Sequence, residues 1–324
     1  MSEFGINEDA KRLILAGIRQ STTKQYCSYI NKWLAYCRAH HVHYSTARGS
    51  DVINFLASLY SKGLGYSAIN TARAALSNVL PASVKASVFD GTNSLACRLL
   101  KGVFNKRPSL PRYTITWNPD IVLSHLESLK LDTICLKSLT LKLTMLLALC
   151  SAQRLQGLRA LSVHNCVIQD GVCTFYIDKL LKTTKYGRHQ QPIRFSRFHN
   201  RELCVVAHIE RYMTCTKSFR NGANQLLLSY VKPHKPVCED SISRWLKTVL
   251  RQSGVDITQF SAHSTRSAST SKVQKMEGGT SIESILSSAG WARDSTFRKF
   301  YCRDFYSTSE TVFSTAVLSK ITDT

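Results

Sequence analysis

The amino-acid sequence predicts a mostly α-helical protein that also contains a small antiparallel β-sheet. Three observations support this fold class. Apolar residues recur at helical spacing through the N-terminal third of the chain and again beyond residue 203. A short middle region is rich in β-forming residues and is broken by the turn dipeptide Asp170-Gly171. Finally, a basic stretch that contains prolines separates the chain into two parts.

The N-terminal part predicts a helical bundle over residues 21–107, preceded by a partly ordered basic arm over residues 1–20. Ser21, Thr22 and Thr23 are candidate N-caps for the first helix. Its apolar stripe follows at helical spacing: Tyr26, Ile30, Trp33, Leu34 and Cys37. Further helices are expected from Ser50 to Gly63, from Ser67 to Pro81 and from Ser94 to Phe104.

Residues 108–117 are predicted to link two domains, because prolines stop helices and favour extended chain. Lys106 and Arg107 directly precede this stretch and Arg112 lies within it, and these three basic residues are candidate DNA contacts. A basic linker suits a protein that closes around a DNA duplex. An ordinary surface loop is the alternative, and the sequence alone does not separate the two.

The second domain is expected over residues 118–324. Asn118 can cap a helix that starts at Pro119. The next helix, Ile134 to Cys150, is apolar on most faces and is therefore expected in the centre of the domain. It leads to Arg154, and an arginine that follows a buried helix must meet an anion or reach solvent.

A small antiparallel sheet is expected next, and helices return after it. The expected strands are Leu161 to Ile168, Val172 to Asp178 and Gln190 to Phe195. The expected helices are 203–216, 240–252, 263–276, 282–288 and 294–301, with a last amphipathic helix from Thr311 to Ile321.

The net charge predicts a polyanionic partner. The chain has 43 Lys+Arg against 21 Asp+Glu, a formal net charge of +22, which favours nucleic acid first and an anionic membrane second. The longest uncharged run, Leu143 to Gln153, is shorter than the roughly 20 apolar residues that a membrane span needs. We therefore expect double-stranded DNA as the partner and no membrane.

The region that follows the second expected strand and includes the third is strongly basic. From Lys179 to Arg201 there are seven basic residues and no acidic one. A hairpin tip that carries Lys182, Lys185 and Arg188 would contact DNA phosphates. A solvated, charged hairpin without a ligand is the alternative.

The cysteines point to a reducing compartment. The chain has 11 of them, scattered and without a C-x-x-C pair. An odd count without a signal peptide is typical of reduced thiols in the cytosol or nucleus. Since no Cys and His residues cluster at ligand spacing, we expect no metal site.

The stretch from His263 to Tyr306 contains the side chains that a tyrosine needs to attack a phosphodiester. A tyrosine hydroxyl must lose its proton as it attacks, which a histidine can accept. Arginines can bind the charge that develops on phosphate, and an indole N–H can donate a further hydrogen bond. A lysine can protonate the leaving oxygen. No metal, ATP or other cofactor is required.

The candidate residues for this chemistry are spread over both halves of the domain, and each also has an ordinary structural explanation as an ion pair, a surface lysine or a core aromatic. They are Arg154, Lys182, His263, Arg266, Trp291 and Tyr301. A Ser/Thr-rich patch from Ser261 to Ser271 lies inside the same stretch, and the sequence assigns it no role.

The order Arg, hairpin Lys, H-x-x-R, G-W and Tyr resembles the tyrosine recombinase (phage-integrase-like) family. The resemblance covers residues 20–306 and implies a helical core-binding domain (residues 21–107) followed by a mixed α/β catalytic domain (residues 118–324). Four stretches resemble eukaryotic DIRS-type retrotransposon recombinases, with Crypton-type elements second: Gly65 to Arg73, Gln153-Arg154, His263 to Thr270 and Thr296 to Tyr301.

The resemblance implies a role for each candidate. Arg154 and Arg266 would bind the scissile phosphate. His263 would be an acid/base and phosphate contact, and Trp291 stands where many members have a second histidine. Lys182 would be the general acid, with Lys185 as its rival. Tyr301 would be the nucleophile.

The implied function is that of a site-specific recombinase or integrase of a mobile element. The enzyme would cleave and rejoin DNA in the nucleus through a 3′-phosphotyrosine intermediate, as a homo-tetramer on DNA that exchanges its C-terminal helix. Two alternatives stay open. One is a DNA-binding protein with this fold but without catalysis, and the other is a type IB topoisomerase.

Two departures from the family pattern bear on the site. Gly157 stands where many members have an acidic residue, three positions after the first arginine. The tyrosine follows Trp291 by one residue more than is common in bacterial and phage members, and one residue turns a helical side chain by about 100°. Tyr306 is therefore the alternative nucleophile.

Overall fold

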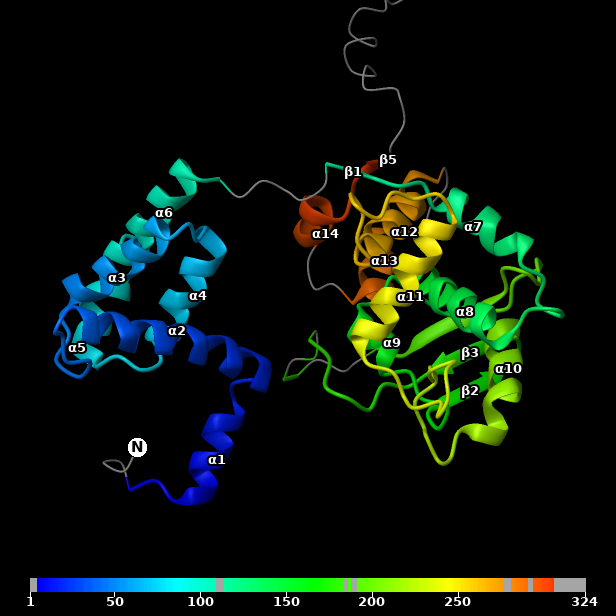
Figure 1. The fold of residues 1–324 in the computed structure, drawn as a ribbon, viewed down its shortest axis with the longest axis horizontal. Coiled ribbons are helices and arrows are strands. Elements are labelled where there is room, and N and C mark those ends of the chain that lie inside the picture. The colour runs from blue at the N-terminus through cyan, green and yellow to red at the C-terminus, as the bar shows by residue number, and fades with distance from the viewer. Residues whose placement is uncertain are drawn as a thin grey trace, which may run out of the picture. The chain divides into compact units, whose positions relative to one another are not determined.

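The protein is described by a computed structural model that covers residues 5–108, 114–182, 184, 186–187, 191–276, 281–290 and 294–305. The chain forms two compact units, Met1–Pro111 and Arg112–Thr324 (Figure 1). Several predicted features lie outside the described residues: Arg112, Lys185, Arg188, Trp291, Tyr306 and the helix from Thr311 to Ile321.

The first unit is built from helices. They are α1 (Glu8–Ala16), α2 (Gln20–Ala39), α3 (Gly49–Ser61), α4 (Tyr66–Leu76), α5 (Ala82–Phe89) and α6 (Leu95–Lys106). The predicted stripe on α2 faces the core through Trp33, whose ring meets Phe55 of α3 edge-on at 5.3 Å between centroids. Burial of such apolar faces stabilises the bundle more than helix propensity does.

Two of these helices were not predicted. The expected N-terminal arm contains α1, which begins where the Asn7 side chain accepts a hydrogen bond of 2.8 Å from the Ala10 nitrogen. Helix α5 has no regular apolar stripe, although Val88 is buried and Val84 and Phe89 pack partly buried against the core. Helix α1 buries no residue and lies outside the bundle core, whereas α5 has no regular apolar spacing that would predict a helix.

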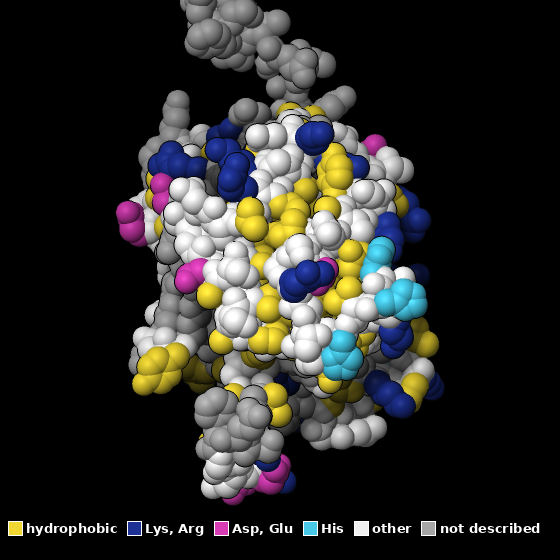
Figure 2. Space-filling view, turned by 90° about the vertical axis from the view of Figure 1, so that its left-hand side faces the viewer, with side chains coloured by type: hydrophobic (Ala, Val, Ile, Leu, Met, Phe, Trp, Pro, Cys, Tyr) yellow, Lys and Arg dark blue, Asp and Glu magenta, His cyan; other side chains and the backbone are white. Residues whose placement is uncertain are grey.

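Histidine side chains gather at one edge of the face shown in Figure 2. The exposed histidines of this unit, His40, His41 and His43, directly follow α2. The Nδ1 atom of His43 lies 2.7 Å from the Ser45 hydroxyl. Within the part of the chain that the structure describes, no group of three or more His, Cys, Asp or Glu side chains could hold a metal ion.

The second unit is organised around α8 (Leu136–Ser151). Every residue from Leu139 to Leu149 is buried, as expected for a helix that is apolar on most faces. Around it pack α10 (Val205–Thr216), α11 (Glu239–Gln252) and α12 (Ser264–Lys275). The unit also contains α7 (Pro119–Ser128), α9 (Leu155–Arg159), α13 (Ile282–Ala289) and α14 (Asp294–Phe300).

The predicted antiparallel sheet consists of β2 (Cys166–Gln169), β3 (Val172–Phe175) and β4 (Ile193–Ser196), in that order. Asp170 and Gly171 both have positive φ, as the tight turn between β2 and β3 requires. The fold class, mostly α-helical with a small antiparallel sheet, is confirmed. The first strand is shorter than expected, and Ser162 makes instead an isolated bridge with Gln225.

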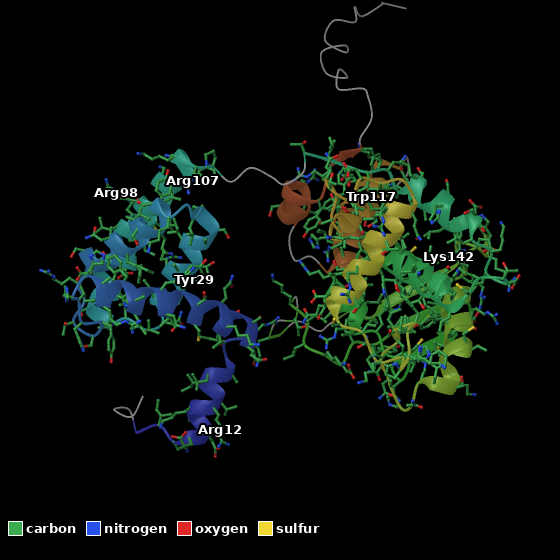
Figure 3. The ribbon with its side chains drawn as sticks, viewed as in Figure 1. Arg12, Tyr29, Arg98, Arg107, Trp117 and Lys142 are labelled. Atoms are coloured by element: carbon green, nitrogen blue, oxygen red, sulfur yellow. The ribbon has the colours of Figure 1, made fainter. Side chains whose placement is uncertain are left out.

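Part of the expected linker belongs to the second unit. Strand β1 (Ile115–Thr116) pairs in parallel with β5 (Asp304–Phe305), so Ile115 lies opposite Asp304. Trp117 is buried, and its indole N–H donates a hydrogen bond of 2.9 Å to the Ser264 hydroxyl (Figure 3). Residues 115–117 therefore anchor the start of this unit to α12 and are not linker.

A charged pair stands inside the second unit. The side chain of Lys142 on α8 is fully buried, and its ammonium group lies 3.2 Å from a carboxylate oxygen of Glu202 (Figure 3). It also donates to the Leu129 carbonyl, and the same Glu202 oxygen accepts from the Leu131 nitrogen at 2.8 Å. The pair fixes the loop between α7 and α8.

None of the helices among the described residues is long and apolar enough to cross a membrane.

Candidate active site

Helix α12 carries two of the predicted residues at its start. His263 is the N-cap residue and Arg266 lies one turn later, so both face the same side. The start of the helix is held in place by Ser264, which accepts from Trp117 and donates to the Ser261 carbonyl at 2.6 Å. The H-x-x-R spacing therefore becomes a pair of side chains on a fixed helix end.

Arg266 is a buried cation. The residue is 2% exposed, and one terminal nitrogen of its guanidinium donates a hydrogen bond of 3.0 Å to the Ala289 carbonyl at the end of α13. Its guanidinium carbon lies 5.4 Å from the centre of the Tyr301 ring. Burial and the nearby charge of Arg154 lower the pKa of Arg266. An anion bound here would offset both effects and stabilise the charged form of Arg266.

Tyr301 directly follows α14 and contacts His263. Its hydroxyl oxygen lies 3.2 Å from Nε2 of His263, within hydrogen-bonding distance. The nitrogen of Tyr301 donates at 2.8 Å to the carbonyl of Phe297, which is itself fully buried in a small apolar cluster with Ala152 and Ile285. The extra residue between Trp291 and the tyrosine therefore does not move Tyr301 away from His263.

Arg154 and Lys182 reach the same place from upstream. Arg154 is the N-cap residue of α9, after a turn in which Ala152 adopts a left-handed conformation with φ of 47°. Lys182 lies in the connection between β3 and β4, where its main-chain nitrogen donates at 2.8 Å to the Gln156 side chain. The charges of both residues act on His263.

The electrostatics of the site keep His263 neutral. Desolvation by the surrounding protein, together with the positive charges of Arg266, Arg154 and Lys182, lowers the pKa of His263 to about 4. His263 is nevertheless exposed at its surface, so solvent reaches the ring. A neutral imidazole at pH 7 can accept the proton of the neighbouring tyrosine.

Two glutamines next to Arg154 were not among the predicted site residues. A Cβ atom at Gly157 would lie 2.8 Å from the side-chain oxygen of Gln153, so Gln153 occupies the space beside this glycine. The amide nitrogen of Gln153 donates at 2.7 Å to the Ser288 carbonyl on α13. Gln156 binds the main chain at Lys182. Their place on either side of Arg154 was the signal that could have identified them.

The predicted DNA contacts at the end of α6 are partly engaged within the first unit. Arg107 donates at 3.2 Å to the Leu64 carbonyl, and its guanidinium carbon lies 4.4 Å from the centre of the Tyr60 ring (Figure 3). Arg107 is thus held by the helical bundle, whereas the sequence suggested part of a free basic stretch. Lys106, the last residue of α6, is exposed.

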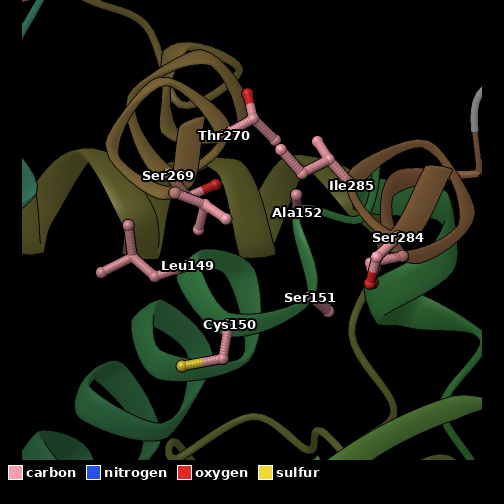
Figure 4. Close-up of a pocket in the computed structure, with 10 residues that line it drawn as sticks. Leu149, Cys150, Ser151, Ala152, Ser269, Thr270, Ser284 and Ile285 are labelled. Atoms are coloured by element: carbon pink, nitrogen blue, oxygen red, sulfur yellow. The ribbon is translucent and has the colours of Figure 1, made fainter. Parts of the chain in front are cut away.

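A cavity of about 160 Å³ lies beside this site, between α8, α12 and α13 (Figure 4). Its walls consist of small and apolar side chains such as Ala152, Ser269 and Ile285. None of the described candidate residues lines it. The cavity therefore lies between the helices that support the site and is not part of the site itself.

The comparisons with known proteins bear on the fold. No protein-family model and no curated protein sequence matches this chain. Among solved structures, the XerH site-specific recombinase bound to palindromic difH substrate is 15% identical with a TM-score of 0.61, over 91% of this chain and 77% of that one. The Tn1549 transposon integrase in complex with transposon right-end DNA is 15% identical with a TM-score of 0.61, over 95% and 96%.

A lambda integrase tetramer bound to a Holliday junction is also similar, at 19% identity and a TM-score of 0.54, over 91% of this chain and 74% of that one. These proteins are tyrosine recombinases. At such low identity the likeness shows that this chain has their fold.

Proposed function

We propose that this chain is a site-specific recombinase or integrase of a mobile element, which cleaves and rejoins DNA through a 3′-phosphotyrosine intermediate. One observation carries the proposal. The Tyr301 hydroxyl lies 3.2 Å from Nε2 of His263, whose lowered pKa favours the neutral ring. The buried guanidinium of Arg266 lies beside the same ring.

The proposed reaction exchanges one phosphodiester for another. The oxygen of Tyr301 attacks phosphorus as His263 accepts its proton. The bond between phosphorus and the 5′ oxygen breaks, and this oxygen takes a proton from Lys182. The 5′-hydroxyl of a second strand later attacks the phosphotyrosine and releases the tyrosine. Because the number of phosphodiester bonds is conserved, the exchange requires no ATP.

The two arginines are suited to bind the phosphate during this exchange. Charge grows on the non-bridging oxygens as phosphorus becomes five-coordinate, and planar guanidinium groups bind such oxygens in pairs. Arg266 is already buried, so it pays no further desolvation when DNA arrives. Repulsion between Arg154 and Arg266 also falls once an anion lies between them.

The proposed partner is double-stranded DNA, and the proposed assembly is a homo-tetramer on DNA in the nucleus. The formal net charge of +22 supports a polyanionic partner. The similarity to DNA-bound XerH and Tn1549 integrase, and to a lambda integrase tetramer on a Holliday junction, supports the partner and the assembly. The sequences of the motifs favour a DIRS-type element as the origin of this chain, with a Crypton-type element second.

The test uses a nicked duplex that carries the terminal sequence of the encoding element, incubated in the presence of EDTA. We expect a protein–DNA adduct that survives SDS. Tyr301→Phe should abolish the adduct and leave DNA binding intact, whereas Tyr44→Phe, at an exposed tyrosine of the first unit, should behave as the wild type. An adduct formed by Tyr301→Phe would assign the nucleophile elsewhere, with Tyr306 as the first candidate.

The two alternatives give different outcomes in the same assay. A non-catalytic DNA-binding protein would bind the duplex and form no adduct. The replacement of an acidic residue by Gly157 and Gln153 next to Arg154 is the observation that favours this alternative. A type IB topoisomerase would form adducts without a preferred site and relax supercoiled plasmid without pairing two duplexes.

A further inference from the structure

One face of α12 follows the chain from Tyr301 to Phe305. The residues on this face are spaced four apart, starting with His263, which meets the Tyr301 hydroxyl. Ser267 and Ser271 come next, and Lys275 ends the row with its ammonium group 4.8 Å from the centre of the Phe305 ring. Side chains at this spacing lie on one side of a helix.

The two serines hold the main chain of the tyrosine. The Ser267 hydroxyl donates a hydrogen bond of 2.9 Å to the Tyr301 carbonyl, and the Ser271 hydroxyl donates to the same oxygen at 2.9 Å. Ser271 also accepts from the Arg303 nitrogen at 3.0 Å. Both residues are buried, with exposed fractions of 7% for Ser267 and 1% for Ser271.

These bonds differ from what serines inside a helix usually make. Such hydroxyls commonly bond to a carbonyl one turn earlier in their own helix. Ser269 and Thr270 of α12 do so, donating to the Arg266 carbonyl at 3.3 Å and 2.7 Å. Ser267 and Ser271 instead reach across to another segment of the chain.

The position of Tyr301 explains why its carbonyl needs partners. Carbonyl groups at the C-terminal end of a helix have no N–H donor within that helix. A buried carbonyl there must accept a hydrogen bond from a donor elsewhere in the chain. Tyr301 directly follows α14, so its carbonyl is such a group. The donors come from the same helix that carries His263. The main chain and the hydroxyl of one residue are thus both located relative to α12.

We propose that Ser267 and Ser271 are positioning residues that keep the Tyr301 hydroxyl at His263 and Arg266 for in-line attack. This inference rests on the proposed function. It assigns a role to the Ser/Thr-rich patch, which the sequence left without one. Misplacing a reacting group by about 1 Å can cost on the order of 100-fold in rate, so loss of both hydrogen bonds should be felt in the chemical step.

The first test measures the rate of adduct formation on the nicked duplex with the DNA saturated by enzyme, together with the affinity for DNA. We expect Ser267→Ala and Ser271→Ala each to lower the rate by about 10-fold and the double variant by about 100-fold, with unchanged affinity. Ser267→Thr keeps a hydroxyl and should restore most of the rate.

Ser269→Ala is the matched control. Ser269 lies on the same helix and is 7% exposed, like Ser267, but it lines the cavity of Figure 4. It should keep the wild-type rate. A double variant of Ser267 and Ser271 with the wild-type rate, or a loss of rate in Ser269→Ala as large as theirs, would overturn the inference.

A second measurement does not require activity. Hydrogen exchange of the peptide that contains Arg303 should accelerate in Ser271→Ala, which removes the acceptor of that amide, and stay unchanged in Ser269→Ala. Absence of any wild-type adduct would contradict the proposed function, and the exchange would still decide whether the serines hold this segment. Unchanged exchange in Ser271→Ala would contradict the inference alone.

Discussion

The main-chain nitrogen of Lys182 donates a hydrogen bond of 2.8 Å to the side-chain oxygen of Gln156. This bond joins the connection between β3 and β4 to α9, at the turn that begins with Arg154. A neutral side chain thus fixes the position of the proposed general acid, Lys182, relative to Arg154, one of the proposed phosphate ligands. No charge is needed for the contact, so it does not disturb the electrostatics of the site.

Replacing Gln156 should therefore weaken the action of Lys182. Gln156→Met removes the acceptor at similar size, and we expect the rate of adduct formation to fall by about 10-fold. A substrate with a 5′-thio leaving group should suppress the defect of Gln156→Met, because a thiolate leaves without a proton. A defect of equal size on both substrates would mean that Gln156 acts on something other than Lys182.

Lys182→Ala should slow cleavage of ordinary DNA by roughly 100- to 10,000-fold, the contribution typical of a positioned acid. The same 5′-thio substrate should restore the rate. Lys179→Ala, at an exposed lysine of the same connection, serves as the control and should cleave both substrates normally. If Lys185→Ala is rescued and Lys182→Ala is not, the role of the acid belongs to Lys185.

His263 should titrate far below an ordinary histidine. Its pKa is lowered to about 4, because desolvation and the neighbouring positive charges disfavour the protonated ring. The imidazole should thus stay neutral as the pH falls from 7 to about 5, which NMR of the free protein labelled at its histidines can follow. Arg154→Ala removes one positive charge and should raise the midpoint, as should bound DNA. A midpoint near 6.5 in the free protein would contradict this description of the site.

The buried pair Lys142 and Glu202 should matter more for stability than an exposed pair does. Glu202→Gln leaves the fully buried ammonium of Lys142 without its counter-charge, and we expect it to lower the free energy of unfolding by about 3 kcal/mol. Adding Lys142→Met should recover part of this loss. Urea unfolding of the single and double variants measures both effects.

The control for this prediction is an ion pair on the surface. Arg201 and Asp132 lie 2.7 Å apart with both side chains more than half exposed. Asp132→Asn should change the free energy of unfolding far less than Glu202→Gln does, because solvent screens an exposed pair. A loss as large as that of Glu202→Gln would show that burial is not what distinguishes the two pairs.

The elements that could be predicted are those whose buried face appears in the sequence as apolar residues at regular spacing. Helix α2 buries Trp33 and Cys37, and α8 is buried over nearly its whole length, so both left a clear pattern. Helix α5 and the parallel pair of β1 with β5 left none. The pairing of Ile115 with Asp304 joins segments far apart in the chain, and a strand of two residues has no periodicity to detect.

The candidate site divides in the same way. The order of residues from Arg154 to Tyr301 pointed to phosphodiester chemistry because it lists the required functional groups. The glutamines at Gln153 and Gln156 were overlooked because an amide acquires a role only through the partner that it meets. Ser267 and Ser271 were visible as a Ser/Thr-rich patch, but their direction depends on where α14 ends.

By itself, the sequence determined which chemical groups are available, which segments are helical, and that the chain is strongly basic, since these follow from composition and local periodicity. Tertiary structure decided that Arg266 is buried beside Arg154, that His263 is neutral, and that the Tyr301 hydroxyl lies at His263 despite its unusual spacing from Trp291. The physical reason is that burial, desolvation and hydrogen bonding across the chain arise only when distant segments pack together. The tyrosine is located by contacts from α12, and no count of residues along the chain contains that information.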